Sequence, residues 1–335
     1  MWFINLFLDY NVLTGDFMKK VIIIGAAIAL LAGGMVLFFQ SQPRFVWIAE
    51  DRFAEALEAA IADSPFEGTQ IIPLSALPAR MPRTWYGYRI GSDVLPSDDD
   101  ESIVTTYRRL TEQRQYGEAL LLALDPWMVF RKFTSLPLSR EQADNGPAEA
   151  GLMLLAGSDD EAVAAWSAQF LQESPGVFSR DIVIWEHTRE RLFRGGQFQQ
   201  GARTFSWQEI WPRLLDDDEI AWVYAPLSRN RQLPLFETSR LEADVFPSRP
   251  GWNEFGIQAE LLWAVPFGND KNLEKTKETE EWLTDASTQG TIADSLGWIA
   301  AHPGAPPFNP VSSQVRIAWL TSSYVWTLPR HSVFQ

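Results

Sequence analysis

The longest hydrophobic run of the chain lies near its N-terminus. Every residue from Val21 to Phe39 is apolar or glycine, and Lys19 and Lys20 come directly before the run. At about 1.5 Å per residue, a helix of this length spans roughly 28 Å, close to the thickness of a bilayer core. The run has no polar face, so it does not fit a buried core helix. We therefore expect a signal or transmembrane helix over residues 18–40.

The flanks of this run indicate how the helix is used. Cleavage of a signal requires small residues after the apolar run, but the run ends in Leu37-Phe38-Phe39-Gln40. This favours an uncleaved anchor over a cleaved signal that releases a secreted protein. The preceding lysines stay in the cytoplasm and place the rest of the chain on the periplasmic or extracytoplasmic face. Because Met18-Lys19-Lys20 resembles the start of an export signal, residues 1–17 are a short extension or follow a mis-called start codon.

Beyond residue 40, short apolar segments alternate with amphipathic ones. Residues 45–49 are all apolar and predict a buried strand, and a helix with Phe53, Leu57 and Ile61 on one face follows. Residues 69–74 predict the next strand. This strand–helix–strand order favours an α/β domain built on a parallel sheet. No phosphate-binding glycine motif follows the first strand, so a nucleotide site is not supported.

The same patterns predict further elements. Residues 78–96 are predicted to be irregular, and a buried strand over 119–124 is predicted to end at Asp125-Pro126-Trp127. The C-terminal end of a parallel strand is where α/β sheets place ligand contacts. More strands are predicted at 152–156, 181–185, 220–224 and 260–265, and helices are predicted after capping boxes that begin at Ser158 and Ser206.

Composition narrows the class of protein. The 335 residues include 28 Lys and Arg, 43 Asp and Glu, 15 Trp and no Cys, with a net charge of −15. The four charges of residues 1–40 cancel, so the whole −15 belongs to the part predicted to be exported. An acidic surface disfavours nucleic-acid binding. Without cysteine there is no disulfide, no thiolate metal site and no lipid-modified cysteine.

The motifs of common enzymes are missing from the sequence. His187, His302 and His331 are scattered without zinc-site spacing, and there is no Gly-x-Ser-x-Gly motif. Each histidine is interpreted as a surface or turn residue. Carboxylates are abundant, so the composition does not exclude a glycosidase. We expect no enzyme activity, no cofactor and no metal site.

Several C-terminal motifs, taken in order, are similar to those of a known family. They are residues 265–269 (VPFGN), 271–272 (KN), 281–283 (EWL), 289–290 (QG) and 296–301 (LGWIAA). In this order they resemble the C-terminal part of the extracellular solute-binding proteins of ABC importers, especially the carbohydrate type. The start of a helix at Ser206-Trp207-Gln208-Glu209 also resembles this family, with Ser in place of Thr, and Ala300 replaces the usual Pro.

The resemblance implies a two-lobed periplasmic-binding-protein-like fold of type II over residues 41–335, with lobe boundaries near 180–210 and 260. Only about fifty residues separate the motifs at 207–209 and 266–268, which predicts a trimmed second lobe. The implied function is capture of a sugar or similar small polar solute, with ABC permease subunits as partners. Two alternatives remain: an envelope structural or interaction protein that has lost transport, and a carbohydrate-active enzyme.

Candidate ligand contacts are acids and aromatics at predicted strand ends and in adjacent loops. In a sugar site, indoles stack on the apolar faces of sugar rings and carboxylates accept hydroxyl protons. Trp166 and Trp211 lie on helix faces and are predicted to be core, whereas Trp282 and Trp298 match family positions or serve packing. The predicted ligand contacts are Asp51, Asp125, Trp127, Trp185, Glu186, Tyr224 and Trp252.

Overall fold

A computed structural model of the chain describes residues 43–92, 119–139, 152–154, 207–216, 220–245, 256–268, 273–322 and 324–326. The predicted membrane helix, the strand at 181–185 and the candidates Trp185, Glu186 and Trp252 lie outside these ranges. Within the described ranges, no helix has the length and apolar character needed to cross a bilayer.

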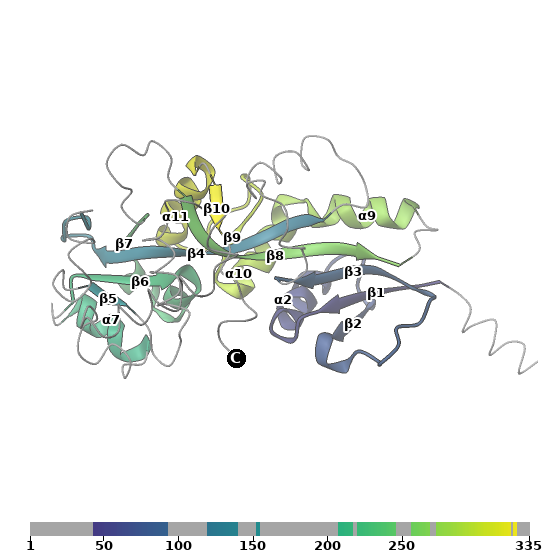
Figure 1. Ribbon diagram of the computed structural model, residues 1–335. Helices are drawn as coiled ribbons and strands as arrows, with labels where there is room; N and C mark the ends of the chain where they lie inside the picture. The colour runs from purple at the N-terminus through teal and green to yellow at the C-terminus, as the bar shows by residue number, and fades with distance from the viewer. Residues whose placement is uncertain are drawn as a thin grey trace, which may run out of the picture.

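The first half of the fold begins with the predicted strand–helix–strand unit (Figure 1). Strand β1 (Arg44–Ala49) is followed by helix α2 (Asp51–Ile61), strand β2 (Gln70–Pro73) and the short 3-10 helix η1 (Leu74–Ala76). Strands β1 and β2 are parallel, as the pattern predicted. Helix α2 buries one face, which includes Phe53, Leu57 and Ile61.

Strand β3 (Trp85–Gly91) corrects the prediction that residues 78–96 are irregular. Its residues 85–90 pair in parallel with β1. Aromatic residues favour a strand here, but Gly87 interrupts the hydrophobic pattern. Gly87 is needed because a side chain there would meet the backbone of β1: an added Cβ would lie 2.0 Å from the carbonyl oxygen of Val46.

Two long strands run across the molecule (Figure 1). Strand β4 (Leu120–Lys132) and strand β8 (Gly256–Phe267) are antiparallel to each other, and β8 is also antiparallel to β3. The sheet is therefore mixed, which corrects the expectation of a parallel sheet. Strand β4 was predicted to end at Asp125-Pro126-Trp127, but it continues to Lys132. It does so because residues 127–131 pair with a further strand.

The second half is built around the C-terminal part of β4. There β4 pairs antiparallel with β6 (Trp222–Pro226) and β7 (Leu241–Asp244), and β5 (Leu152–Leu154) pairs in parallel with β6. Helix α7 (Trp207–Leu215), the 3-10 helix η2 (Leu227–Gln232) and the one-turn helix α8 (Leu235–Thr238) complete this part. The predicted strands at 152–156 and 220–224 are thus confirmed with shifted ends.

The C-terminal helices have clear end signals. Helix α9 (Leu273–Leu283) is followed by α10 (Ala286–Leu296), which Asp285 caps through its carboxylate and Gly297 ends with a φ of 73°. Helix α11 (Pro310–Thr321) begins with a capping box formed by Asn309 and Ser312. The short strands β9 (Ile299–Ala300) and β10 (Tyr324–Trp326) pair with β4 and β8, respectively.

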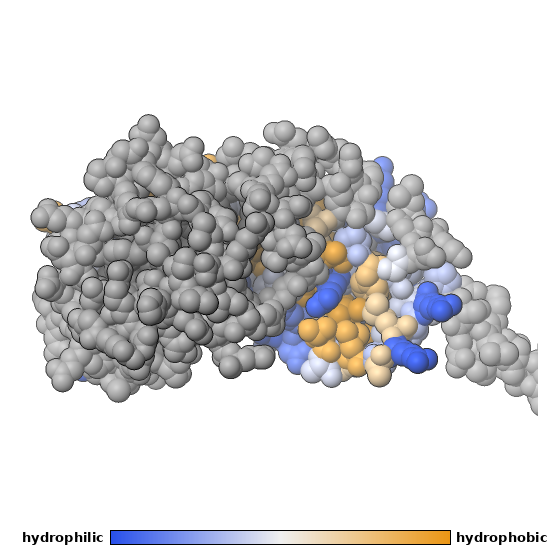
Figure 2. Space-filling model, in the orientation of Figure 1, coloured by the Kyte–Doolittle hydropathy of each residue, from blue (hydrophilic) through white to orange (hydrophobic). Residues whose placement is uncertain are grey.

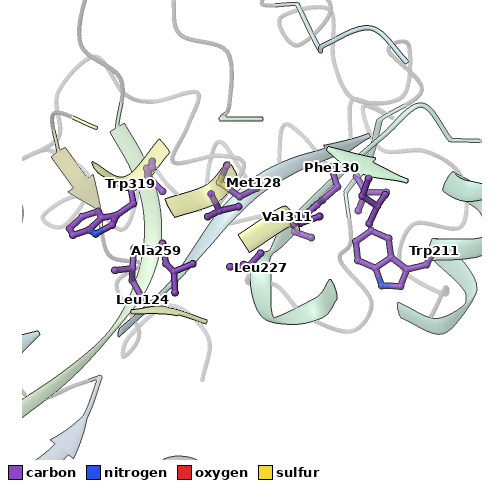
Figure 3. Packing of buried hydrophobic residues seen from close by; sticks show 14 of the residues in the cluster. Leu124, Met128, Phe130, Trp211, Leu227, Ala259, Val311 and Trp319 are labelled. Atoms are coloured by element: carbon purple, nitrogen blue, oxygen red, sulfur yellow. The ribbon is translucent and has the colours of Figure 1, made fainter. Parts of the chain in front are cut away.

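Two hydrophobic cores lie along the sheet. One packs β1, β3, α2, α9 and α10 around Trp47 and Phe53, and we call this part the β1 half. The other packs β6, α7 and α11 against the C-terminal part of β4, where Met128, Phe130 and Trp211 are buried, and we call it the β6 half (Figure 3). Strands β4 and β8 contribute to both cores. These two long strands therefore link the two halves of the fold.

Candidate functional site

Polar side chains meet at the C-terminal edge of β1 and β3. Glu50 follows β1 directly and Ser92 follows β3, and the two strands are parallel, so their ends share one edge. The backbone N–H of Ser92 donates to Oε1 of Glu50 at 2.8 Å. Arg52, in the first turn of α2, donates to Oε2 of the same carboxylate at 3.1 and 3.2 Å. Gly91 leaves room for this carboxylate, because an added Cβ would lie 2.5 Å from Oε1 of Glu50.

Arg52 connects this edge to strand β8. Its Nη2 lies 2.5 Å from Oε1 of Glu260 and donates to Oγ of Ser92 at 2.7 Å. Glu260 can be reached because β8 continues beyond the end of β3, whose last residue pairs with Trp263. The guanidinium also lies 4.3 Å from the centre of the Phe53 ring. The Arg52 side chain is 43% exposed, so solvent can reach this ion pair.

Asp125 lies directly opposite Glu260 in the register of β4 and β8. It is 5% exposed and accepts hydrogen bonds from the backbone N–H of Ser228 at 2.9 Å and from its hydroxyl at 2.6 Å. Burial raises the pKa of Asp125 to about 7; the hydrogen bonds from Ser228 and the charge of Arg229 oppose the rise, and the charge of Glu260 adds to it. Near neutral pH, Asp125 therefore exchanges a proton while remaining buried.

These residues form one connected group at the boundary between the two halves, and we call it the junction cluster. Glu50, Arg52 and Ser92 come from the β1 half, whereas Ser228 belongs to η2 of the β6 half. Asp125 and Glu260 lie on the two strands that pass between them. The junction cluster consists of Glu50, Arg52, Ser92, Asp125, Ser228 and Glu260.

The other described candidates lie on either side of the junction cluster. Asp51 is exposed at the start of α2, and hydrogen bonds from the hydroxyl of Ser75 and from its backbone N–H, the latter at 3.0 Å, lower the pKa of Asp51. Trp127 and Tyr224 pack on each other with ring centres 5.4 Å apart, and they are 6% and 0% exposed. In this conformation the two rings contribute to the core, so their surfaces are covered by protein.

Sequence reasoning missed part of the junction cluster. Arg52 directly follows Asp51, and at this position only Asp51 was predicted as a ligand contact. Glu260 carries a usable signal, since it is the one charged residue in the apolar segment 256–267. Ser228 carries no such signal, because its role depends on η2 lying beside Asp125 in three dimensions.

The C-terminal motif residues are mostly structural. Trp298 is 5% exposed and meets the Phe53 ring edge-on, and Trp282 packs on Trp47 at 5.8 Å between ring centres. Gln289 is 2% exposed; its Nε2 donates to the carbonyl oxygens of Leu121 and Leu283, and its Oε1 accepts from the N–H of His302 at 2.7 Å. Trp211 is core, as predicted. His302 is a turn residue, as predicted: its Nδ1 accepts from the N–H of Gly304 at 2.9 Å.

A small recess lies away from the junction cluster, where α10, the loop after β9 and α11 meet. None of the cluster residues lines it. Its walls are mainly apolar and are formed in part by Gly290, Trp298, Pro306, Phe308 and Arg316. Within the described ranges, no group of three or more His, Cys, Asp or Glu is arranged to hold a metal ion.

The fold is that of the extracellular solute-binding proteins. No protein-family model and no curated protein matches the chain, but many solved structures do. A probable secreted solute-binding lipoprotein from Streptomyces coelicolor matches with a TM-score of 0.57 and 12% identity, over 86% of this chain and 89% of the other. A bacterial solute receptor with an exclusive preference for β-D-galactopyranose matches with a TM-score of 0.56 and 12% identity, over 85% and 87%.

A ferric binding protein of Bordetella also matches, with a TM-score of 0.50 and 12% identity, over 80% of this chain and 89% of the other. At such identities the likeness shows the fold alone. The structural neighbours are solute-binding proteins of ABC transporters, as the motif resemblance predicted, and they bind ligands as different as a sugar and iron.

Proposed function

We propose that this chain is an extracytoplasmic solute-binding protein that captures a sugar or similar polyhydroxyl solute for an ABC importer, with the junction cluster in its binding site. The observation that carries the proposal is the position of this cluster. It lies where β1 and β3 end and where β4 and β8 pass from one half of the fold to the other. In sheets of this kind, ligands bind beyond the carboxyl ends of parallel strands.

The chemistry of the junction cluster fits an uncharged polar solute. Arg52 is already paired with Glu50 and Glu260, so an anionic solute would have to displace a carboxylate from it. Glu260 is 22% exposed and Arg52 is 43% exposed, so both remain within reach of a solute. A carboxylate accepts hydroxyl protons and a guanidinium donates to hydroxyl oxygens. Sugar hydroxyls can satisfy both groups without introducing a net charge.

The proposal also includes the membrane anchor expected near the N-terminus, which we call the tether. The apolar run from Val21 to Phe39 would hold the chain in the cytoplasmic membrane, with residues 41–335 outside. Without a cysteine, this helix replaces the lipid by which a lipoprotein is anchored. The motif resemblance supports permease subunits of an ABC importer as partners.

A ligand screen tests the proposal. The full-length chain in detergent is heated with D-galactose, D-glucose, chitin oligosaccharides and ferric citrate, each in separate samples. A solute present at a hundred times its Kd stabilises the folded state by about 2.7 kcal/mol, which raises Tm by roughly 5 °C. We expect at least one sugar to do so. Stabilisation by ferric citrate alone would contradict a sugar ligand and retain a binding function.

One observation favours a second candidate, a glycoside-processing enzyme. Asp125 is buried with a pKa of about 7, and Glu260 opposite it is partly exposed, so the environments of the two carboxyl groups differ. Such a difference between two carboxyl groups is typical of glycosidases. Incubation of the chain with aryl glycosides distinguishes the two functions. Turnover that is lost in Asp125→Asn would favour the enzyme, and binding without turnover would favour the solute-binding protein.

A further inference from the structure

The N-terminal end of β1 carries exposed arginines on a chain that is otherwise strongly acidic. Arg44 opens β1, and Arg80 and Arg83 lie in the loop before β3; all three side chains are exposed. Among the described residues, none of the three takes part in a side-chain hydrogen bond or ion pair. These arginines stand out in a chain of net charge −15.

Apolar and aromatic side chains accompany these arginines. Met81, between two of them, is 45% exposed, and Trp85 is half-buried at the start of β3. Figure 2 shows, on the β1 half, an apolar area with hydrophilic residues around it. A mixture of arginine, tryptophan and an exposed large apolar side chain is typical of protein surfaces that rest at a membrane interface.

Two backbone hydrogen bonds hold the loop at the beginning of β1. The N–H of Arg44 donates to the carbonyl oxygen of Thr84 at 2.8 Å, and the N–H of Trp85 donates to that of Pro82 at 3.1 Å. Trp85 is also the register partner of Arg44. The arginines therefore lie at the end of the sheet where the chain enters β1 (Figure 1).

The length of chain before β1 brings this end close to the proposed membrane anchor. Only residues 40–43 separate the apolar run from Arg44. Even fully extended, the steps from Phe39 to Arg44 span about 17 Å. The N-terminal end of β1 must therefore stay within this distance of the bilayer surface, whereas the junction cluster lies at the opposite, C-terminal end of β1.

The acidic residues near the N-terminal end of β1 do not lie on the loop that carries Arg80 and Arg83. Asp63 and Glu67 belong to the turn between α2 and β2, on the other side of β1 from the arginine-bearing loop. Helix α9 carries both signs near its start, because Glu274 and Glu278 accompany Lys275 and Lys277. The unbalanced positive charge is thus confined to the β3 side, around Arg44, Arg80 and Arg83.

We propose that Arg44, Arg80 and Arg83, together with Met81 and Trp85, form a surface that docks on the anionic lipid headgroups of the membrane in which residues 21–39 are anchored. This inference rests on the proposed tether. Docking holds the β1 half against the bilayer and directs the junction cluster away from it. Each arginine near an anionic surface contributes about a five-fold preference for that surface over a neutral one.

The absence of cysteine allows a direct test on the full-length chain. Met81→Cys is labelled with an environment-sensitive fluorophore, and the protein is reconstituted into vesicles of phosphatidylcholine alone or with about one-third phosphatidylglycerol, a content that gives a strongly negative surface. Quencher groups attached to the lipid headgroups report contact. We expect strong quenching in the anionic vesicles, weak quenching in the neutral ones, and loss of quenching at about 1 M salt, where the Debye length falls to about 3 Å.

Matched variants give the controls. Labelled Leu235→Cys, on an exposed position of α8 in the β6 half, should show no quenching in either vesicle. Arg80→Gln with Arg83→Gln should reduce quenching at position 81 to the neutral-vesicle level. Equal quenching at position 81 in both vesicle types, unaffected by these substitutions, would overturn the proposal, as would no quenching at all.

Alkaline extraction separates failure of the docking surface from failure of the tether. A chain that stays in the membrane at high pH is inserted, and absence of quenching at position 81 then overturns the docking surface alone. If alkali removes the chain from the vesicles, the proposed tether is wrong. The proposal that lipid headgroups occupy this surface then fails with it. In that case the ligand screen still decides whether the chain binds a solute.

Discussion

Asp125 and Glu260 lie opposite each other on the two strands that connect the halves of the fold, yet their environments differ. Asp125 is buried and accepts two hydrogen bonds from uncharged groups of Ser228. Glu260 is partly exposed and faces the guanidinium of Arg52. Burial thus drives Asp125 toward its neutral form, whereas Glu260 is paired with a guanidinium.

The first prediction concerns the pH dependence of stability. The pKa of Asp125 is about 7 in the folded state and near 3.8 in the unfolded state, so the folded state binds more protons between these values. Stability should therefore fall as pH rises from about 4 to 7, by on the order of 3 kcal/mol from this group. Asp125→Asn should remove this slope, as measured by urea denaturation at pH 5 and pH 8.

Asp63→Asn is the matched control, because Asp63 is an exposed acid in a turn. It should leave the pH slope of the free energy of unfolding unchanged. A slope that persists in Asp125→Asn would show that another group is responsible.

A second prediction tests the packing of β3 against β1. Gly87 has a φ of 148°, and an added Cβ would overlap the carbonyl oxygen of Val46. Gly87→Ala should destabilise the fold by more than about 3 kcal/mol, because the backbone itself must move. Gly68 also has a positive φ, of 77°, but nothing lies within 4 Å of the added Cβ.

Gly68→Ala should therefore cost only about 1–2 kcal/mol, from backbone strain. Denaturant midpoints of the two variants provide the comparison. Equal losses in both would contradict the close approach of β3 to β1.

A third prediction concerns the role of Trp298. This side chain is buried against Phe53 and lies outside the junction cluster. Trp298→Ala should lower the free energy of unfolding by about 3–5 kcal/mol. Leu320→Ala, at a residue of α11 that is 44% exposed, should change it by less than about 0.5 kcal/mol. If Trp298→Phe folds normally but loses solute binding, Trp298 is a ligand contact and the packing interpretation is wrong.

Much of the fold could be predicted from the sequence because local signals agreed with packing. The apolar segment 45–49 and the one-sided helix after it predicted β1 and α2, since both bury their apolar residues in one core. Strand β3 was missed because Gly87, which the close approach of β1 requires, looks like a break in the hydrophobic pattern. Strand β4 was cut short because Asp125 and Pro126 look like a strand end, although their neighbours on β8 and β6 keep the strand extended.

The candidate site could be predicted only in part. Asp125 was predicted as a ligand contact because it follows a buried apolar run, and the structure places it at the boundary between the two halves. Its pairing with Ser228 and the bridge from Arg52 to Glu260 join residues more than a hundred positions apart. No local pattern encodes such distances. The role of Trp127 and Tyr224 as sugar platforms stays a prediction, and their burial against each other assigns them to the core in this conformation.

The most direct test of the central claim measures solute affinity in variants of the junction cluster. With the sugar that raises Tm most in the screen, calorimetric titration compares the full-length chain with Glu260→Gln, Arg52→Gln and the surface control Asp63→Asn. Loss of a hydrogen bond to a charged group should weaken binding about ten-fold or more in the first two variants, while the control binds as the unmodified chain does. Unchanged affinity in both cluster variants, with folding intact, would place the solute site elsewhere and contradict the account.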